Sequence, residues 1–246
     1  MRERLKVENL SFSYGDRKIL ENINLSLEEG ELVSLLGISG SGKTTLFSLI
    51  AGLLKPQSGR ILLKGEDITA SSGHISYMMQ KDLLLPYRSI EDNVILPLLL
   101  KGTSPKNARE EVQGLFDTFG IPGTQKKYPA QLSGGMRQRA ALLRTYLFSK
   151  EMALLDEPFS ALDALTKEEL HGWYMDMMEK LHMSVLFITH DIDEAILLSD
   201  RIYIMAGQPG GIRGEIRISE QKPRGNGFKL SERFLEIKRK ILGELQ

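Results

Sequence analysis

Cysteine is absent from this chain of 246 residues, and the absence limits what can hold the chain together. Neither a disulfide framework nor a cysteine-ligated metal site can form. A chain of this length needs no such cross-links, because it can bury a full hydrophobic core as one α/β domain or as one domain with an inserted subdomain. The composition fits a reducing compartment.

Long apolar runs are absent as well. The longest candidate covers residues 94–100 and contains Pro97, whereas a helix that spans a bilayer needs roughly 20 mostly apolar residues. The first residues, MRERLK, are too charged for a secretory signal. We therefore expect a chain that is soluble or is held at a membrane by a partner.

An excess of charge of either sign is also missing. The chain has 32 basic and 32 acidic residues. Bulk electrostatic attraction to nucleic acid or to anionic lipid is therefore excluded, although this balance does not exclude a local basic patch. We expect no nucleic-acid partner.

The most informative feature that is present is a glycine-rich loop at residues 37–45, GISGSGKTT. It fits the pattern G-x-x-x-x-G-K-[ST], in which backbone N–H groups and a helix N-terminus surround nucleotide phosphates. An apolar run precedes it at 31–36, and apolar residues at helical spacing follow it. In this phosphate loop, Lys43 is expected to reach the β- and γ-phosphates and Thr44 to bind Mg²⁺. The predicted nucleotide-binding residues are Gly37, Ile38, Ser39, Gly40, Ser41, Gly42, Lys43, Thr44 and Thr45.

The pattern along the chain alternates between strand-like and helix-like segments. The sequence predicts strands over 5–36, 60–65, 74–79, 152–155 and 185–189 and a closing hairpin over 201–218. Helical spacing marks 108–119, 136–148 and an amphipathic tail at 228–245, which we expect to dock on the core. The later alternation of strands with helices favours a parallel sheet. We predict an α/β core at 1–84 and 151–220, a helical subdomain at 85–150 and a helical tail at 221–246.

Two adjacent carboxylates end the apolar strand predicted at 152–155. Asp156 is placed to hold Mg²⁺ through water, and Glu157 is placed to activate the water that attacks a phosphate. Paired carboxylates on a surface loop are usually only solvated. The preceding strand and the following Pro158 favour the catalytic interpretation.

A second glycine-containing segment, LSGGMRQR at 132–139, opens a predicted helix. One nucleotide needs only one phosphate loop, and by itself Ser-Gly-Gly is only a helix start. In combination, it suggests a site built from two chains, in which Ser133 and Gly135 of one copy contact the γ-phosphate held by the other.

These motifs, in this order, resemble the nucleotide-binding subunit of ATP-binding cassette (ABC) transporters. The resemblance covers nearly the whole chain and rests on five segments: 37–45, the signature loop LSGGMRQR, LLDEP at 154–158, SALD at 160–163 and THD at 189–191. It implies an ATP- and Mg²⁺-dependent ATPase. The implied fold is α/β, a P-loop NTPase (RecA-like) core with an N-terminal antiparallel β subdomain and an inserted α-helical subdomain.

The resemblance also assigns roles that spacing alone would not give. Tyr14 would stack on adenine, Gln80 would be a ligand of Mg²⁺ and water, and His190 would orient the γ-phosphate and the water. Gly134 would join Ser133 and Gly135 in the signature loop. Asp163 would couple the two sites across a dimer.

Segment 191–195 resembles that of importers, and segment 80–94 resembles that of the nitrate/sulfonate/taurine branch of importers. The resemblance implies a homodimer that couples ATP binding and hydrolysis to uptake of a small solute from the cytoplasmic face of the cell membrane. Its partners would be an integral membrane permease, with a cytoplasmic helix seated near the segment after Gln80, and an extracytoplasmic solute-binding protein. Importers of pyrimidine precursors share these features and are the alternative.

Two other classes are less well supported. A soluble ABC ATPase of DNA repair or the ribosome needs a coiled-coil insertion or two tandem cassettes, and neither fits this chain. A small-molecule kinase would share the phosphate loop but would not need the signature loop.

Overall fold

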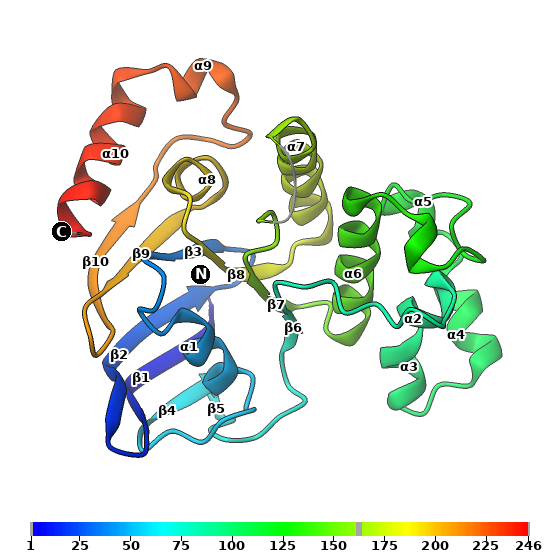
Figure 1. Ribbon diagram of the computed structural model, residues 1–246, viewed down its shortest axis with the longest axis horizontal. Helices are drawn as coiled ribbons and strands as arrows, with labels where there is room; N and C mark the ends of the chain where they lie inside the picture. Colours follow the sequence, from blue (N-terminus) through cyan, green and yellow to red (C-terminus); the bar gives the residue numbers. More distant parts are fainter. Residues whose placement is uncertain (1, 161–163, 246) are drawn as a thin grey trace.

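Two β-sheets and a group of helices make up the computed structural model, which describes residues 2–160 and 164–245 (Figure 1). The first sheet is antiparallel and has the strand order β2-β1-β4-β5. Its strands are β1 (Glu3–Tyr14), β2 (Arg17–Glu28), β4 (Ser58–Leu63) and β5 (Glu66–Asp67).

The second sheet has the order β10-β9-β3-β8-β7-β6. Its strands are β3 (Leu32–Gly37), β6 (Ser76–Met78), β7 (Met152–Asp156), β8 (Ser184–Thr189), β9 (Arg201–Ala206) and β10 (Gly211–Arg217). All neighbours pair in parallel except β9 and β10, which form an antiparallel hairpin. Every residue of β3, β7, β8 and β9 is buried, which explains their almost continuous apolar sequence. The predicted parallel sheet and closing hairpin are confirmed.

Helix α1 (Lys43–Ile50) lies in the core between the two sheets (Figure 1). Its apolar side chains share one hydrophobic cluster with residues of β1 and β2 from one sheet and of β3, β8 and β9 from the other. The helix begins directly after the phosphate loop. Burial of α1 therefore fixes the loop against both sheets.

Helices α7 (Ala164–Leu181), α8 (Ile192–Leu198), α9 (Asn226–Lys229) and α10 (Glu232–Glu244) complete this part of the molecule. The tail was predicted as one helix, but it is two, because the Ser231 hydroxyl accepts the Phe234 N–H and so begins α10 as an N-cap. Phe234, Ile237 and Ile241 are buried in a cluster shared with α8 and β9. The tail docks on the core, as predicted.

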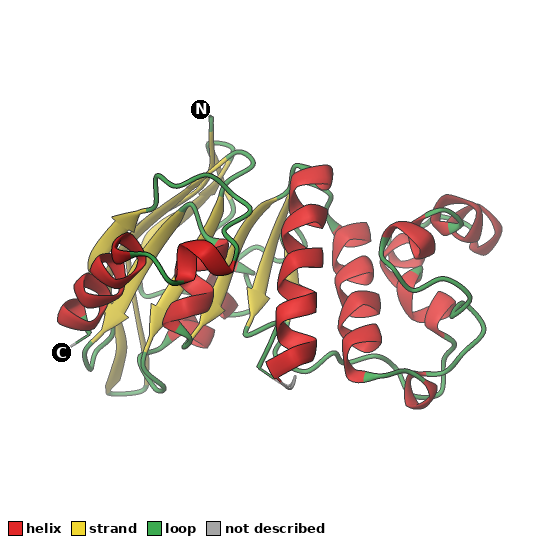
Figure 2. Cartoon of the chain, turned by 90° about the horizontal axis from the view of Figure 1, so that it is seen from above, coloured by secondary structure: helices red, strands yellow, loops and turns green. Residues whose placement is uncertain are grey.

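The remaining helices form a helical group at one end of the molecule (Figures 1 and 2). They are α2 (Ile90–Val94), α3 (Leu96–Leu100), α4 (Pro105–Val112), α5 (Leu115–Thr118) and α6 (Gly134–Phe148). The chain enters this group from β6 and returns through β7, the neighbour of β6 in the sheet, so the group is an insertion between adjacent strands. The helix expected over 108–119 is interrupted between Val112 and Leu115, where Gly114 lowers helix propensity.

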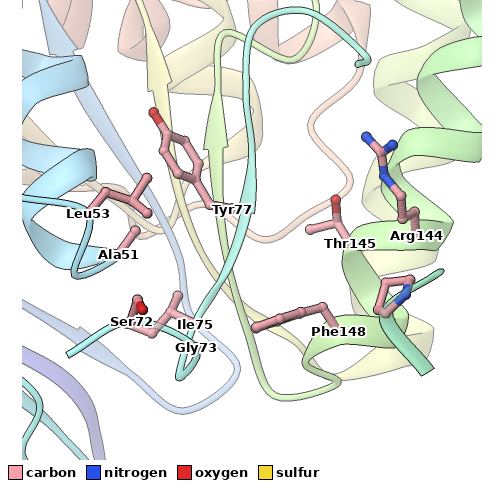
Figure 3. A pocket seen from close by; sticks show the side chains of 10 residues that line it. Ala51, Leu53, Ser72, Gly73, Ile75, Tyr77, Arg144, Thr145 and Phe148 are labelled. Carbon is pink, nitrogen blue, oxygen red and sulfur yellow. The ribbon is translucent and has the colours of Figure 1, made fainter. Parts of the chain in front are cut away.

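A cleft of about 270 Å³ separates the helical group from the sheets (Figure 3). Ala51 and Leu53 after α1 and Tyr77 on β6 line one side, and Arg144 and Phe148 on α6 line the other. None of the described helices is long and apolar enough to cross a membrane.

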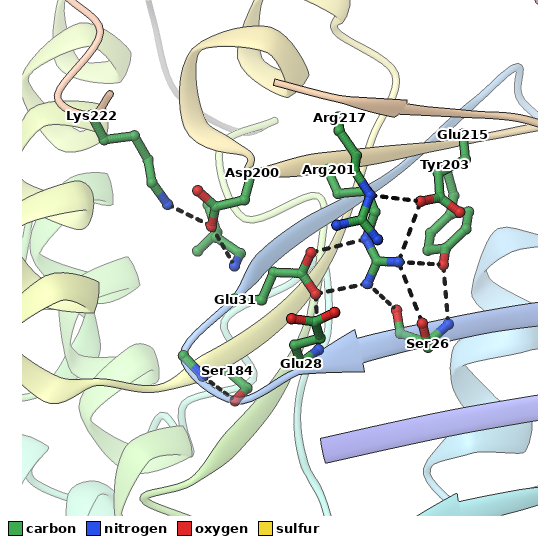
Figure 4. A network of polar contacts seen from close by, with 12 residues as sticks. Ser26, Glu28, Glu31, Ser184, Asp200, Arg201, Tyr203, Glu215, Arg217 and Lys222 are labelled. Carbon is green, nitrogen blue, oxygen red and sulfur yellow. Dashed lines mark hydrogen bonds and ion pairs between the residues drawn. The ribbon is translucent and has the colours of Figure 1, made fainter. Parts of the chain in front are cut away.

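A buried arginine joins the two sheets (Figure 4). Arg201 on β9 is 3% exposed. Its guanidinium donates to both carboxylate oxygens of Glu31 at 2.9 and 2.7 Å, to the Ser26 carbonyl on β2 at 2.9 Å and to the Tyr203 hydroxyl at 3.0 Å. These bonds fix β2 of the antiparallel sheet to β9 of the second sheet.

Candidate active site

The phosphate loop connects β3 to α1 and needs glycine at two positions for different reasons. Gly42 has φ 96°, and a Cβ there would lie 2.7 Å from Leu20. A Cβ on Gly37 would lie 2.3 Å from the Met205 carbonyl oxygen. Both distances are shorter than any allowed contact, so these positions accept only glycine.

Polar groups of the loop face inward. The Lys43 ammonium donates to the carbonyl oxygens of Gly37 and Ile38, at 2.8 Å each. Burial lowers the pKa of Lys43, an effect that the carboxylates of Glu157 and Asp156 oppose. The Ser41 hydroxyl is buried and has no hydrogen-bond partner among the described residues. An anion in this loop would give the Ser41 hydroxyl a partner.

Asp156 ends β7 beside the loop and is 6% exposed. Burial raises the pKa of Asp156, although hydrogen bonds from the hydroxyls of Thr44 and Tyr77 oppose the shift. The distance from the Tyr77 hydroxyl to the Asp156 carboxylate is 3.3 Å. A buried carboxylate beside a threonine hydroxyl supplies the oxygen donors that Mg²⁺ prefers.

Gln80, Glu157 and His190 meet at the carboxyl ends of β6, β7 and β8. The Gln80 side-chain amide donates to Glu157 Oε2 at 3.2 Å, and His190 Nδ1 lies 3.2 Å from Glu157 Oε1. Glu157 has φ 47°, a conformation rarely adopted by glutamate. Its N–H donates to the Ile188 carbonyl at 3.1 Å, which holds this strained residue in place.

Comparisons with known proteins identify the family of the chain. A family model described as "ABC transporter" matches residues 20–160, more than half of the chain. This chain belongs to the ABC transporter family. It is an ABC-type ATPase subunit with a transporter cassette fold, as its sequence motifs indicate.

Individual relatives cover most of the chain. The formylaminopyrimidine import ATP-binding protein ThiZ of Halalkalibacterium halodurans is 46% identical over 85% of this chain and 82% of its own. The aliphatic sulfonates import ATP-binding protein SsuB of Bacillus cereus is 40% identical over 94% and 90%. Among solved structures, the ATP-binding cassette MJ0796, a dimer bound to ADP and Pi, is 29% identical, covers 90% of this chain and 99% of its own, and has a TM-score of 0.72.

The other predicted site residues of this ABC cassette lie on separate elements. Tyr14 ends β1, is 54% exposed and packs edge-on against Phe12 with ring centres 4.8 Å apart. Ser133 is the N-cap of α6, where its hydroxyl accepts the Met136 N–H, and Gly134 and Gly135 form the first turn. The phosphate loop and the signature loop lead into α1 and α6, and these two helices belong to different hydrophobic clusters. Asp163 lies outside the described residues.

Sequence reasoning missed a buried network beside His190. Glu194 on α8 is 5% exposed. Its carboxylate accepts from the Thr189 hydroxyl and from Lys167 Nζ on α7, at 2.5 Å each, and lies 3.5 Å from His171 Nε2. The Thr189 hydroxyl in turn accepts the Asp191 N–H at 3.0 Å. The network fixes both neighbours of His190.

Tyr77 was also missed as a site residue. In the sequence it reads as an ordinary strand aromatic, and no local signal distinguishes it. In the structure its hydroxyl contacts Asp156 while its ring lines the cleft beside the helical group (Figure 3). Burial, with the Asp156 carboxylate, raises the pKa of Tyr77 strongly, so the phenol is a hydrogen-bond donor at neutral pH.

Proposed function

We propose that this chain is the ATP-hydrolysing subunit of an importer of a small solute and acts as a homodimer with two composite ATP sites. In each site, one copy supplies the phosphate loop and the catalytic residues. The other supplies Ser133, Gly134 and Gly135. The observation that carries this proposal is the contact of Gln80 and His190 with Glu157, each at 3.2 Å, next to the phosphate loop.

The nucleotide is held by groups that the chain already orients. Tyr14 stacks on the adenine, and the residues of the phosphate loop surround the phosphates, with Lys43 at the β- and γ-phosphates. Thr44, Asp156 and Gln80 fit a magnesium ion, because a hydroxyl, a buried carboxylate and an amide oxygen are the oxygen ligands that this ion prefers. A bound Mg²⁺ would neutralise charge on the phosphoryl group that is transferred.

Hydrolysis divides the remaining work between two side chains. Glu157 accepts a proton from water as the water oxygen bonds to the γ-phosphorus and the bond to the β–γ bridging oxygen breaks. His190 orients the γ-phosphate and the water. The products are ADP and inorganic phosphate. Closure of the dimer on ATP is the step that moves the permease, and hydrolysis reopens it.

The cleft between the sheets and α6 is the proposed seat of a cytoplasmic helix of the permease. Leu53 on its rim is exposed, and so are Leu83, Leu85 and Tyr87 in the segment after Gln80. Exposed apolar residues around a concave surface suit an apolar helix face. A permease helix in this seat would hold the subunit at the cytoplasmic face of the cell membrane.

The imported compound is proposed from the relatives. SsuB and ThiZ are named for import of aliphatic sulfonates and of formylaminopyrimidine. We favour a nitrate-, sulfonate- or taurine-like solute, with a pyrimidine precursor as the alternative. An extracytoplasmic solute-binding protein would select the compound, so mass spectrometry of the ligand in that protein identifies it. Co-purification with ribosomes or nucleic acid in place of a permease would contradict transport.

The test of the catalytic assignment is Glu157→Gln, assayed for turnover and for ATP-dependent dimerisation. We expect turnover to be lost and a dimer to accumulate in ATP, because a side-chain amide cannot accept the proton while the binding groups are unchanged. Glu151→Gln is the matched control, since Glu151 precedes the other end of β7 and forms exposed ion pairs. Unchanged hydrolysis in Glu157→Gln would overturn the assignment.

A further inference from the structure

Two arginines of α6 hold the loop that follows Gln80. Arg144 donates to the Leu83 carbonyl at 2.8 Å and to the Asp82 carbonyl at 2.5 Å. Arg137 Nε donates to the Asp82 carboxylate at 3.2 Å. The two arginines are seven residues apart and therefore lie on one face of the helix, two turns from each other.

The burial and the hydrogen bonds of Arg144 are unusual for a charged side chain. Burial lowers the pKa of Arg144, and the Asp82 charge opposes the shift only in part. The hydrogen bonds that the structure gives the guanidinium go to backbone carbonyls and not to a carboxylate. Leu83 has φ 47°, so the segment that Arg144 holds is strained and depends on its surroundings to keep its shape.

The held loop leads directly into the active site. Asp82 is two residues from Gln80, whose side-chain amide donates to Glu157. The helix that carries Arg144 begins at the signature loop, with Ser133 as its N-cap. Arg144 therefore lies on a continuous path from Ser133 through α6 and the loop to Glu157. It also lines the cleft in Figure 3.

We infer that Arg144 is a positioning residue for hydrolysis. It fixes the loop that follows Gln80 to α6, so Gln80 contacts Glu157 only when α6 is correctly placed. The inference rests on the proposed role of Gln80. The turnover rate therefore depends on the position of α6, and so on any contact made with α6 in the cleft. Binding of ATP does not depend on Arg144, because the phosphate loop and Tyr14 lie elsewhere.

The experiment is a double-mutant cycle on the full-length chain. Arg144→Gln, Gln80→Ala and the double variant are compared for kcat, for KM of ATP and for thermal unfolding. We expect Arg144→Gln to lower kcat about tenfold or more while KM changes less than about twofold, since misplacement of a catalytic group by about 1 Å has effects of this order. The double variant is expected to be no slower than Gln80→Ala, because the two residues act through one contact.

Two variants separate positioning from folding. Arg144→Lys keeps the charge and can still reach one carbonyl, so it should recover part of the lost kcat. Arg109→Gln is the control: Arg109 lies on α4 of the same helical group and donates to the carboxylates of Glu91 and Asp92, but does not contact the loop after Gln80. Its kcat should remain within about twofold of the wild type.

Several results would overturn the inference. These are a normal kcat in Arg144→Gln, multiplicative losses of kcat in the double variant, and a Gln80→Ala variant that hydrolyses ATP normally. A loss in Arg144→Gln that follows its melting temperature and is matched by Arg109→Gln would assign Arg144 a structural role only. If Glu157→Gln still abolishes turnover in these cases, the proposed function stands and only the role of Arg144 fails.

Discussion

The buried network beside His190 leads to a quantitative prediction for Lys167→Met. In the folded chain, Lys167 Nζ bonds the Glu194 carboxylate at 2.5 Å and the Asp191 carboxylate at 2.9 Å. The substitution leaves Glu194 buried without its ammonium partner. Breaking a buried ion pair in this way costs about 3–5 kcal/mol. Because the Thr189 hydroxyl still donates to Glu194 and Lys167 is partly exposed, we expect the lower end, about 3 kcal/mol.

The dependence on pH gives this prediction its specificity. Burial alone would raise the pKa of Glu194, but the bonds from His171, Lys167 and Thr189 outweigh it and hold the pKa below its usual range. A depressed carboxylate pKa stabilises the fold above the pKa of the unfolded chain, about 4.3 for glutamate, and this contribution is lost as pH falls through the folded pKa. The destabilisation by Lys167→Met should therefore shrink when Glu194 becomes protonated.

The assay is urea unfolding, followed by circular dichroism, at pH 7 and at a series of lower pH values that extends below the folded pKa of Glu194. Lys180→Met is the control, because Lys180 is an exposed lysine near the end of the same helix, and it should change the free energy of unfolding by less than about 0.5 kcal/mol. A loss below about 1 kcal/mol at pH 7 would refute the reasoning, since it falls outside the range for a broken buried pair. A loss that stays the same from pH 7 to below the folded pKa of Glu194 would refute it too.

Two further predictions concern the phosphate loop and the junction of the sheets. Gly42→Ala should abolish binding of an ATP analogue in calorimetry, because the added Cβ would lie 2.7 Å from Leu20 at a φ of 96°; micromolar binding by this variant would show that the loop tolerates a side chain. Arg201→Met should lower the free energy of unfolding by about 3–5 kcal/mol, since it leaves Glu31 partly buried without its cation. A loss within error of zero in urea unfolding would contradict the role given to Arg201 in joining the two sheets (Figure 4).

Much of the fold follows from periodicity in the sequence. Apolar runs at β3, β7 and β8 are buried on both faces, and their ends carry the phosphate loop, Glu157 and His190. Parallel pairing of these strands aligns their carboxyl ends, which explains how residues distant in sequence could be assigned to one site. The break between α4 and α5 was missed, because the apolar spacing continues across it.

The contacts that were not predicted are long-range side-chain bonds. Arg144 bonds Asp82 across 62 residues, and Tyr77 bonds Asp156 across 79. Each of these residues has a sufficient local explanation, as a helix-surface cation or a strand aromatic. Only the packing of α6 against the loop and of β6 beside β7 reveals their partners, and a single sequence does not encode that packing in any local pattern.

The central claim is that each ATP site is built from two chains, and mixing two inactive variants tests it most directly. Lys43→Ala disables the phosphate loop, and Ser133→Arg blocks the signature loop. In a mixed dimer with composite sites, the phosphate loop of the Ser133→Arg chain faces the signature loop of the Lys43→Ala chain. One site is then intact and the other carries both defects.

The measurement is the ATPase rate of each variant alone and of an equal mixture. Two-chain sites predict that each variant is inactive alone and that the mixture recovers about a quarter of the wild-type rate, because about half of the dimers are mixed and each mixed dimer has one intact site of two. If each site belonged to a single chain, every chain in the mixture would carry a defect. A mixture as inactive as its components, in which mixed dimers are shown to form, would contradict the account.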